Sequence, residues 1–390
     1  MANSFLSGPE QFADEPSYPL DLYFCETCSL VQLLDVIDPE LLFRNYIYVT
    51  GTSDTMAGHN RRYASTIVDL LKLQTDALVV EVASNDGSLL KCFQEHGVRT
   101  LGIEPATNIA QIARSRGVDT IEHFFSLATA RQVLKEHGSA DVIIANNVLA
   151  HVDETLDFLT GCKELLKPEG VVVVEVPYLG ELIDRLEYDT VYHEHLCYFS
   201  LTSLLRLCDE AGLSVFRIDR MPVHGGTIRV YSRARGRYPE HAGNVLKAVA
   251  AEVQEGLTTL ARYERFAKDV EKSARTIRNL LIDLKERGKT VAGYGAPAKG
   301  NTLLNYSGIG VELLPYTVDK NPRKVNLYTP GMHIPVLPTS VLLQKQPDYL
   351  FILAWNFTEE IMMQQREYRE HGGQFIVPLP EPKVVLACNS

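Results

Sequence analysis

Long apolar runs are missing from this chain of 390 residues, and cysteine is scarce. No apolar run approaches ~18 residues, and no charged-then-apolar leader opens the sequence, so we expect neither a membrane span nor secretion. An odd, scattered set of cysteines suits a reducing cytoplasm better than a disulfide framework, and we expect a cytoplasmic protein. The seven cysteines are Cys25, Cys28, Cys92, Cys162, Cys197, Cys208 and Cys388.

Positive charge is also in short supply. The chain has 38 basic and 49 acidic residues and a net charge of −11, so a basic face for nucleic acid is not expected. An anionic ligand has to be held by a few local cations and by backbone amides. Hydrophobic residues make up 45% and charged residues 22%, which is an ordinary globular balance. The length predicts two or three domains.

Short apolar strands alternate with helical patterns from about residue 66 onward. Strands are expected within 76–84, 99–105, 140–152 and 171–177, and helices within 87–97 and 155–170. This alternation is typical of a parallel, doubly wound sheet. A second α/β pattern runs from "KTVAGYGAPAKGNTLLNY" to "QFIVPLP". Between the two, apolar residues recur every three or four positions and predict a helical connector, as one helix or as two separated at Gly256.

The stretch "VVEVASNDGSLL" (79–90) reads as a strand, a turn of small residues and a helix. Such a turn lets backbone approach a ligand closely, and the helix N-terminus adds donors. The next strand ends in Glu104, where a carboxylate can take both hydroxyls of a ribose. Folds that bind NAD and folds that bind S-adenosylmethionine share this spacing. Because the turn lacks G-x-G-x-x-G and "ADVIIANNVLAHV" matches a methyltransferase loop, S-adenosylmethionine is favoured; a unit that binds nothing is the alternative.

The stretch "VYHEHLCYFS" (191–200) sets two histidines around Glu194. A metal site, a general base and a structural hydrogen-bonded cluster all fit this pattern. On a strand, His193 and His195 would face the same way, as two metal ligands must, but no third ligand with convincing spacing follows. Histidine suits a base because its pKa lies near neutral pH. Taken alone, the stretch does not decide between them.

Two glycine-containing stretches further along carry cations. "HGGTIRVY" (224–231) pairs two glycines with His224 and Arg229, and it fits either a contact to a phosphate or carboxylate or a plain hairpin turn. "GYGAPAKGNT" (293–302) leads from a strand into a helix, and Lys299 adds charge to this anion site. Asp319 stands where a ribose-binding acid would, so an NAD site is a second interpretation of this unit.

Ten blocks of the sequence, in this order, resemble the nucleotide-deoxysugar C-methyltransferases, which make branched-chain sugars. The blocks are "YPLDLYFCETCSLVQL", "LFRNYIYVTGTS", "EVASNDGSLL", "IEPATNIA", "ANNVLAHV", "YHEHLCYFS", "HGGTIRVY", "GYGAPAKGNTLLNY", "VDKNPRKVNLYTPG" and "AWNF". The resemblance implies an α/β protein with a Rossmann-like methyltransferase domain and a second Rossmann-like domain. It implies a zinc-type module over 1–65, the S-adenosylmethionine-dependent domain over 66–240, the helical connector over 241–287 and a nucleotide-sugar-binding domain over 288–390.

The same resemblance implies the reaction and its residues. A methyl group would go to the carbon beside the ketone, C-3, of a nucleotide-linked (dTDP-linked) 4-keto deoxysugar. His195 would be the base, assisted by Tyr192, Glu194 and either Tyr46 or Tyr48. S-adenosylmethionine would be held by Glu81, Ser84, Asn85, Asp86, Glu104, Pro105, Asn108 and Asn146. The sugar nucleotide would be held by Asn147, His151, His224, Arg229, Tyr294, Lys299, Arg323 and Lys324.

The zinc module departs from the family pattern. The family uses two Cys-x-x-Cys pairs, whereas this chain has only Cys25 and Cys28, and "MANSFLSGPEQ" looks like a start inside the module. Structural zinc takes four ligands, so the expected site is incomplete. Two rival functions remain: an NAD-dependent oxidoreductase built on the second α/β unit, and a methyltransferase homologue that binds ligands without turnover. An O-methyltransferase would differ in the atom that carries the new methyl group.

Overall fold

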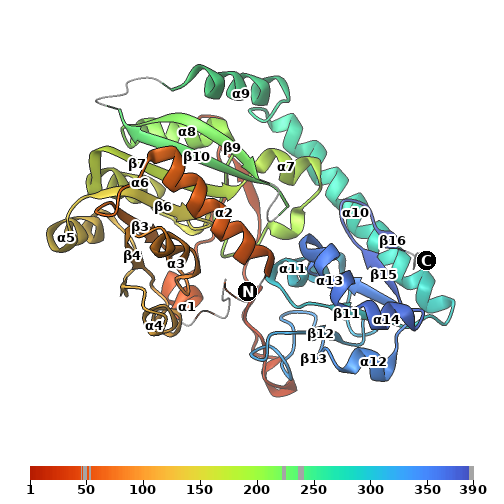
Figure 1. Cartoon of the computed structure of the whole chain (residues 1–390). Coiled ribbons are helices and arrows are strands. Elements are labelled where there is room, and N and C mark those ends of the chain that lie inside the picture. Colours follow the sequence, from red (N-terminus) through yellow and green to blue (C-terminus); the bar gives the residue numbers. More distant parts are fainter. Residues whose placement is uncertain (45, 47–50, 52–53, 222–224, 236–240, 386–390) are drawn as a thin grey trace.

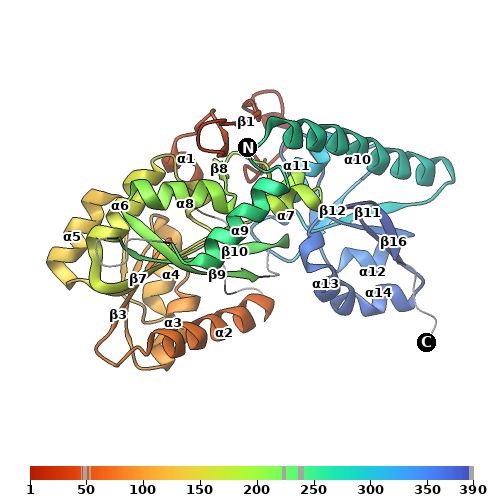
Figure 2. The same ribbon diagram turned by 90° about the horizontal axis from the view of Figure 1, so that it is seen from above.

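The computed structural model describes residues 1–44, 46, 51, 54–221, 225–235 and 241–385. The chain forms two α/β lobes, seen at the left and right of Figure 1, and a small N-terminal segment. In both views the N-terminus lies where the two lobes meet (Figures 1 and 2). No helix in the described part of the chain combines the length and apolarity that a membrane crossing needs.

The first lobe is built on a seven-stranded sheet in the order β5-β4-β3-β6-β7-β10-β9. Its first five strands are parallel and its last two are antiparallel. The strands are β3 (Leu78–Val82), β4 (Arg99–Ile103), β5 (Thr120–Ile121), β6 (Ala140–Asn146), β7 (Leu166–Pro177), β9 (Leu213–Met221) and β10 (Thr227–Ala234). The antiparallel pair departs from the all-parallel sheet predicted above.

Side-chain alternation along the strands divides the first lobe into two cores. In β7, Val172 and Val174 pack into one core and Val171 and Val173 into the other, because successive strand residues point to opposite faces. Helices cover both faces, as doubly wound folds require. The first core also takes residues of α5 (Leu127–His137), α6 (Thr155–Leu165) and α8 (Leu201–Glu210), and the second takes residues of α2 (Asp54–Leu71), α3 (Ser88–Glu95) and α4 (Thr107–Ser115).

Two consecutive helices join the lobes, α9 (Gly243–Gln254) and α10 (Leu260–Glu286). Gly256 lies between them with φ 81°, a left-handed conformation that ends a helix at little cost for glycine. The connector is therefore two helices, one of the two forms expected. The long helix α10 runs along the outside of the second lobe in both views (Figures 1 and 2).

The second lobe is a six-stranded sheet in the order β13-β12-β11-β14-β15-β16, parallel except for β16. Its strands are β11 (Val291–Tyr294), β12 (Thr317–Asp319), β13 (Val336–Pro338), β14 (Tyr349–Ile352), β15 (Gln374–Val377) and β16 (Lys383–Val385). Its helices are α11 (Ala298–Ser307), α12 (Val341–Lys345), α13 (Thr358–Gln364) and α14 (Arg366–Glu370). Both lobes thus carry the Rossmann-like alternation predicted from the sequence.

The N-terminal segment forms hydrogen bonds with both lobes. Its strands β1 (Leu22–Phe24) and β2 (Val31–Leu33) form an antiparallel sheet with β8 (Cys197–Tyr198), and the short helix α1 (Pro39–Phe43) follows. The Asn301 amide donates a 2.7 Å hydrogen bond to the carbonyl oxygen of Ala2, which ties the start of the chain to α11. The segment therefore supports β8, two residues after His195.

Candidate active site

One cavity of about 1180 Å³ collects residues from the N-terminal segment and from both lobes. Its volume exceeds the ~300–1,000 Å³ of an ordinary small-molecule pocket. The carboxyl ends of β3, β4, β6 and β7 open into it from one side and those of β11, β12 and β14 from the other. Ligands of parallel α/β sheets bind at those strand ends, so the cavity has room and position for two ligands.

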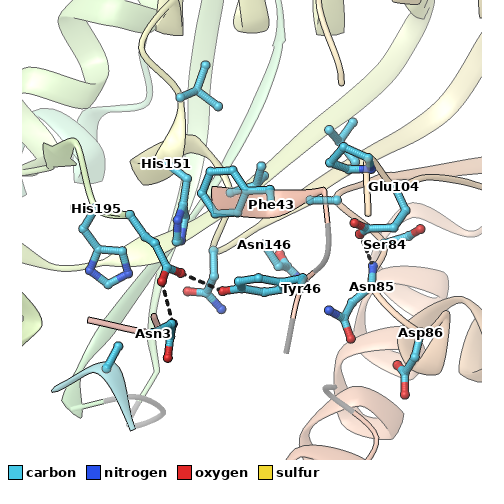
Figure 3. A pocket seen from close by; sticks show the side chains of 18 of the residues that line it. Asn3, Phe43, Tyr46, Ser84, Asn85, Asp86, Glu104, Asn146, His151 and His195 are labelled. Carbon is cyan, nitrogen blue, oxygen red and sulfur yellow. Dashed lines mark hydrogen bonds between the residues drawn. The ribbon is translucent and has the colours of Figure 1, made fainter. Parts of the chain in front are cut away.

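The turn after β3 forms the first end of the cavity. Ala83, Asn85 and Gly87 have φ of 54°, 48° and 74°, conformations that only glycine adopts without cost. Glu104 holds the turn, because its carboxylate oxygens accept hydrogen bonds from the amides of Asn85 (2.8 Å) and Ala106 (2.9 Å). Figure 3 shows the Glu104 carboxylate pointing toward Asn85, and the dashed line marks its hydrogen bond from the Asn85 backbone amide.

Three buried carboxylates make this end acidic. Burial, together with the charges of Asp86 and Glu104, raises the pKa of Glu81 well above its ordinary value. Burial also raises the pKa of Glu104, against the hydrogen bonds of Ala106 and Asn85. One oxygen of Glu81 and the hydroxyl of Ser84 are buried without a partner in the described part of the chain. Such a site suits a cationic ligand with hydroxyl and ammonium donors, which S-adenosylmethionine provides.

Asp86 has a different role from the other two acids. Its side chain is fully buried, and it accepts a 3.0 Å hydrogen bond from the Gly51 amide and pairs with Arg116. Asn108, also expected at the cofactor, is paired with the backbone of Tyr46 through two hydrogen bonds of 3.1 and 2.8 Å. The cavity lining includes Asp86 but not Asn108. Asn108 therefore positions the Tyr46 segment.

At the opposite end lies His195, 8% exposed, and its hydrogen bonds define which nitrogen carries the proton. Nδ1 is 2.8 Å from the Thr190 carbonyl oxygen, which can only accept, so Nδ1 is the protonated nitrogen. Nε2 is 2.9 Å from the Tyr192 hydroxyl, which therefore donates to it. This tautomer presents the basic lone pair of Nε2 beside Tyr192.

Glu194 forms its hydrogen bonds with residues other than His195. Its two oxygens accept hydrogen bonds from the Asn3 amide (2.5 Å) and the Tyr46 hydroxyl (2.9 Å), both drawn in Figure 3. Burial raises the pKa of Glu194, against these two hydrogen bonds and the Lys324 charge. Glu194, which we expected to assist His195, therefore fixes Tyr46 and the N-terminus, and the Thr190 carbonyl orients the His195 ring.

The segment around His193 and His195 is not a strand, so the two side chains do not face the same way as they would to bind one metal ion. Residues 191–196 form turns, and His193 directs Nε2 to the Pro19 carbonyl oxygen, 2.9 Å away. His151 lies beside the base instead, with ring centroids 4.7 Å apart. Burial lowers the pKa of His151 to about 4, so it is neutral at physiological pH. His151 and Asn146 are both seen near His195 in Figure 3.

The second lobe contributes three of the expected cations to the cavity lining, Lys299, Arg323 and Lys324. Lys324 donates a 2.8 Å hydrogen bond to the Ala296 carbonyl oxygen, and burial lowers its pKa against the charges of Asp319 and Glu194. Asp319 accepts hydrogen bonds from the amides of Ala296 and Asn321, both 2.7 Å. The three cations are thus gathered at the end of the sheet where an anion would sit.

Two expected substrate residues lie outside the cavity lining. Arg229 is 2% exposed in β10 and donates to Glu175 at 2.7 Å, so its charge is already neutralised within the sheet. Tyr294 is buried in β11, and its hydroxyl accepts a hydrogen bond from Gln365 at 3.2 Å. Tyr48 and His224 lie outside the described residues. The expected residues that line the cavity are Tyr46, Glu81, Ser84, Asn85, Asp86, Glu104, Pro105, Asn146, Asn147, His151, Tyr192, Glu194, His195, Lys299, Arg323 and Lys324.

Several lining residues were not expected from the sequence. Asn3 and Phe43 come from the N-terminal segment, and His59 from α2 lies 3.5 Å from a Glu175 oxygen. Thr190 contributes through its carbonyl group. Every residue has a backbone carbonyl group, so the identity of residue 190 could not predict this contact. Asn3 and His59 lie outside the ten blocks, and Phe43 lies inside "LFRNYIYVTGTS" without being singled out there, so only tertiary structure shows that the three reach the cavity.

The cysteine pair does not complete a zinc site. Cys25 and Cys28 are partly exposed thiols, and structural zinc requires four ligands. Among the described residues, no group of three or more histidine, cysteine, aspartate or glutamate side chains is placed to hold a metal ion. The described residues therefore do not fit the zinc expected from the resemblance.

Comparison with known families accounts for most of the chain. Residues 56–218 match the family described as "Methyltransferase domain" and residues 222–380 the family described as "C-methyltransferase C-terminal domain". Residues 1–43 match the family described as "Putative zinc binding domain".

One individual relative matches the whole chain, and others match only the part that contains the methyltransferase domain. C-methyltransferase NovU of Streptomyces niveus is 36% identical over 387 residues, which covers 99% of this chain and 92% of NovU. The ubiquinone biosynthesis O-methyltransferase of Haemophilus ducreyi is 24% identical over 156 residues, 35% of this chain and 64% of that enzyme. Among solved structures, magnesium protoporphyrin IX methyltransferase from Synechocystis with bound SAH covers 46% of this chain and 85% of its own, at 14% identity and a TM-score of 0.36.

Proposed function

Because this chain belongs to the C-methyltransferase family, we propose that it methylates the carbon beside the ketone of a nucleotide-linked 4-keto deoxysugar, at C-3. The observation that carries the proposal is the tautomer of His195 in a cavity large enough for two ligands. Carbon methylation beside a ketone needs a base for the α-proton, a donor for the enolate oxygen and an aligned methyl group.

The first step is removal of the α-proton. The C–H bond breaks, the proton goes to Nε2 of His195, and the electron pair enters the enolate. The Tyr192 hydroxyl now occupies Nε2, so the substrate has to displace it. Once displaced, that hydroxyl is a donor next to the reacting atoms and is suited to the enolate oxygen. When Nε2 is protonated, Nδ1–H still donates its hydrogen bond to the Thr190 carbonyl oxygen, so the ring keeps its orientation.

The acidic end of the cavity fits S-adenosylmethionine, which supplies an electrophilic methyl group when bound. Glu104 is placed for the ribose hydroxyls, and the partnerless oxygen of Glu81 is available to a cationic group. Asn146, at the end of β6, lies in the lining between this end and His195, as Figure 3 shows. These residues would orient the bound donor toward His195.

The second lobe is suited to the nucleotide. A nucleoside diphosphate carries its charge on the pyrophosphate, and Lys299, Arg323 and Lys324 offer compensating cations in a chain of net charge −11. The sugar would then extend from these cations toward His151 and His195. A dTDP-linked keto sugar is the substrate we propose.

The test is methyl transfer by His195→Asn, with His193→Asn as matched control because His193 points to Pro19 rather than into the cavity. We expect His195→Asn to retain binding of S-adenosylhomocysteine and to lose roughly 10²-fold or more of its rate, the usual share of a general base. His193→Asn should stay close to wild type. Turnover retained by His195→Asn would rule out the base assignment. NMR of the product decides between a methyl group on carbon and one on oxygen.

A further inference from the structure

The carbonyl group that orients His195 belongs to a short buried 3₁₀ turn, η4 (Tyr188–Thr190). This turn is part of the first lobe in sequence, yet it packs against α11 of the second lobe. The Tyr188 and Tyr306 rings, one from each side of this contact, have centroids 5.4 Å apart. The orientation of the base is therefore linked to an interface between the lobes.

Asp189, the middle residue of η4, is fully buried. One of its oxygens accepts a 2.5 Å hydrogen bond from the indole nitrogen of Trp355, which begins the turn η6 (Trp355–Phe357) after β14. Its other oxygen is buried without a hydrogen-bond partner in the described part of the chain. A buried carboxylate with one oxygen unsatisfied is costly unless a cation lies close by.

Lys299 supplies a positive charge that acts on this carboxyl group. Its ammonium group lies 5.1 Å from the centroid of the Trp355 ring, on the same side of the second lobe, and its charge acts on Asp189 and on neighbouring Glu187. Burial raises the pKa of Asp189, and the charge of Lys299 and the Trp355 hydrogen bond oppose this rise. Lys299 also lines the cavity, so its positive charge can act both on a bound ligand and on the Asp189 carboxyl group.

We propose that Asp189 is a positioning residue for the methyl transfer: anchored by Trp355 and Lys299 of the second lobe, it fixes the peptide whose carbonyl oxygen orients His195. The inference rests on the proposed role of His195 as the base. Asp189 and Trp355 do not line the cavity, so their effect passes through Thr190. The base is then correctly oriented only while the second lobe is docked on η4.

The test uses the full chain and two variants of the anchor, Trp355→Phe and Asp189→Asn. Trp355→Phe removes the indole hydrogen bond and keeps a ring beside Lys299, and Asp189→Asn removes the charge. Proton abstraction is measured directly, as exchange of the substrate's α-proton for deuterium in D₂O with S-adenosylhomocysteine bound, and kcat and KM for methyl transfer are measured in parallel. We expect both variants to lose about 10- to 100-fold in exchange rate and kcat, the range typical of residues that orient a catalytic group. KM for both ligands should stay within about threefold.

The control is Tyr306→Ala, which loosens the same contact through Tyr188 and leaves the Trp355–Asp189 hydrogen bond in place. It should exchange and methylate within about twofold of wild type. An equal loss in Tyr306→Ala would mean that packing of η4 suffices, and it would overturn the inference. Wild-type exchange rates in both anchor variants would overturn it as well. A wild-type protein that neither exchanges nor methylates a keto sugar would overturn the proposed function and this inference together.

Discussion

Burial shifts the pKa of three acids and one histidine that line the cavity. It raises the pKa of Glu81, Glu104 and Glu194 and lowers that of His151 to about 4. The pKa of the buried Glu175 shifts the other way, because His59 and Arg229 outweigh the effect of burial and lower it. Under the proposed function, the neutral His151 next to His195 keeps a second positive charge away from the imidazolium that proton abstraction would form.

Glu187 gives a pH-dependent prediction. Burial raises its pKa from about 4.5 to about 7, so between these values the folded protein holds a proton that the unfolded chain has released. The favourable contribution of this protonation is complete below about pH 4.5 and is lost as the pH rises through 7. Glu187→Gln, which stays neutral, should match wild type near pH 5 and be more stable at pH 8 by roughly 2–3 kcal/mol.

The measurement is urea unfolding of both proteins at pH 5 and pH 8. The wild type should lose stability relative to the variant only over that interval. An equal difference between the two proteins at both pH values would show that the carboxyl group titrates near its ordinary pKa.

At this scale the sequence predicts residue types better than atomic roles. His195 and Tyr192 were both expected at the reacting carbon, and the structure brings them together. The sequence could not assign Nε2 as the basic nitrogen, because that follows from a backbone carbonyl of Thr190. It also could not show that Arg229 is neutralised by Glu175, since the pairing depends on the register of β10 against β7.

Among the secondary-structure elements, helix α8 depends on a side chain from another helix. Glu252 of α9 is 1% exposed and accepts hydrogen bonds from the amides of Leu201 (2.6 Å) and Thr202 (2.7 Å), in the first turn of α8. It also accepts a 2.9 Å hydrogen bond from the Tyr178 hydroxyl. A carboxylate at a helix N-terminus satisfies exposed amides and interacts favourably with the helix dipole.

Glu252→Ala should therefore destabilise the protein. The change leaves two buried amides of α8 and the Tyr178 hydroxyl without their acceptor, at a cost of about 3 kcal/mol. Urea unfolding followed by circular dichroism measures it. Glu255→Ala, an exposed residue on the same helix end, is the control and should change stability by less than about 0.5 kcal/mol. Equal stability of the two variants would contradict the capping role.

Elements of the two sheets were predictable where the hydrophobic pattern is strong, and much less so elsewhere. The strands β3, β4 and β6 lie within the ranges expected from alternation and apolar content, whereas β7 begins at Leu166, inside the stretch 155–170 that was expected to be helical. The antiparallel β9–β10 pair was anticipated only as the hairpin alternative for 224–231, and its two strands were not delimited from the sequence. The segment 191–196 forms turns because it is held by contacts distant in sequence, such as Leu33 to Leu196 and His193 to Pro19.

At the scale of the whole molecule, the cavity draws its walls from three parts of the chain. The acidic end belongs to the first lobe, the cationic wall to the second, and Asn3 enters from the N-terminus. Local motifs predicted each wall separately. Their meeting could not be predicted from them, because contacts such as Asn3–Glu194 and Trp355–Asp189 join residues more than 160 positions apart.

Two ligands in one cavity predict additive stabilisation. Thermal unfolding should show a higher midpoint with S-adenosylhomocysteine, a higher one with thymidine diphosphate, and the highest with both, because each binds only the folded protein. At a hundredfold excess over Kd, each ligand contributes about 2.7 kcal/mol. NAD serves as the control and should have no effect. Stabilisation by NAD alone would instead favour an oxidoreductase built on the second lobe.

The division of the cavity into an acidic and a cationic wall also bears on how such enzymes diversify. Under the proposed function, changes at the carboxyl ends of β11, β12 and β14 would alter which nucleotide carries the sugar, while the proposed catalytic residues stay unchanged in the other lobe. The contact of Asp189 in η4 with Trp355 ties the two sets together, and so does the N-terminal segment, through Ala2–Asn301 and Asn3–Glu194. If the C-terminal lobe were replaced by one from another protein, the new lobe would need a tryptophan at the position of Trp355 to keep the proposed methyl-transfer activity of the first lobe.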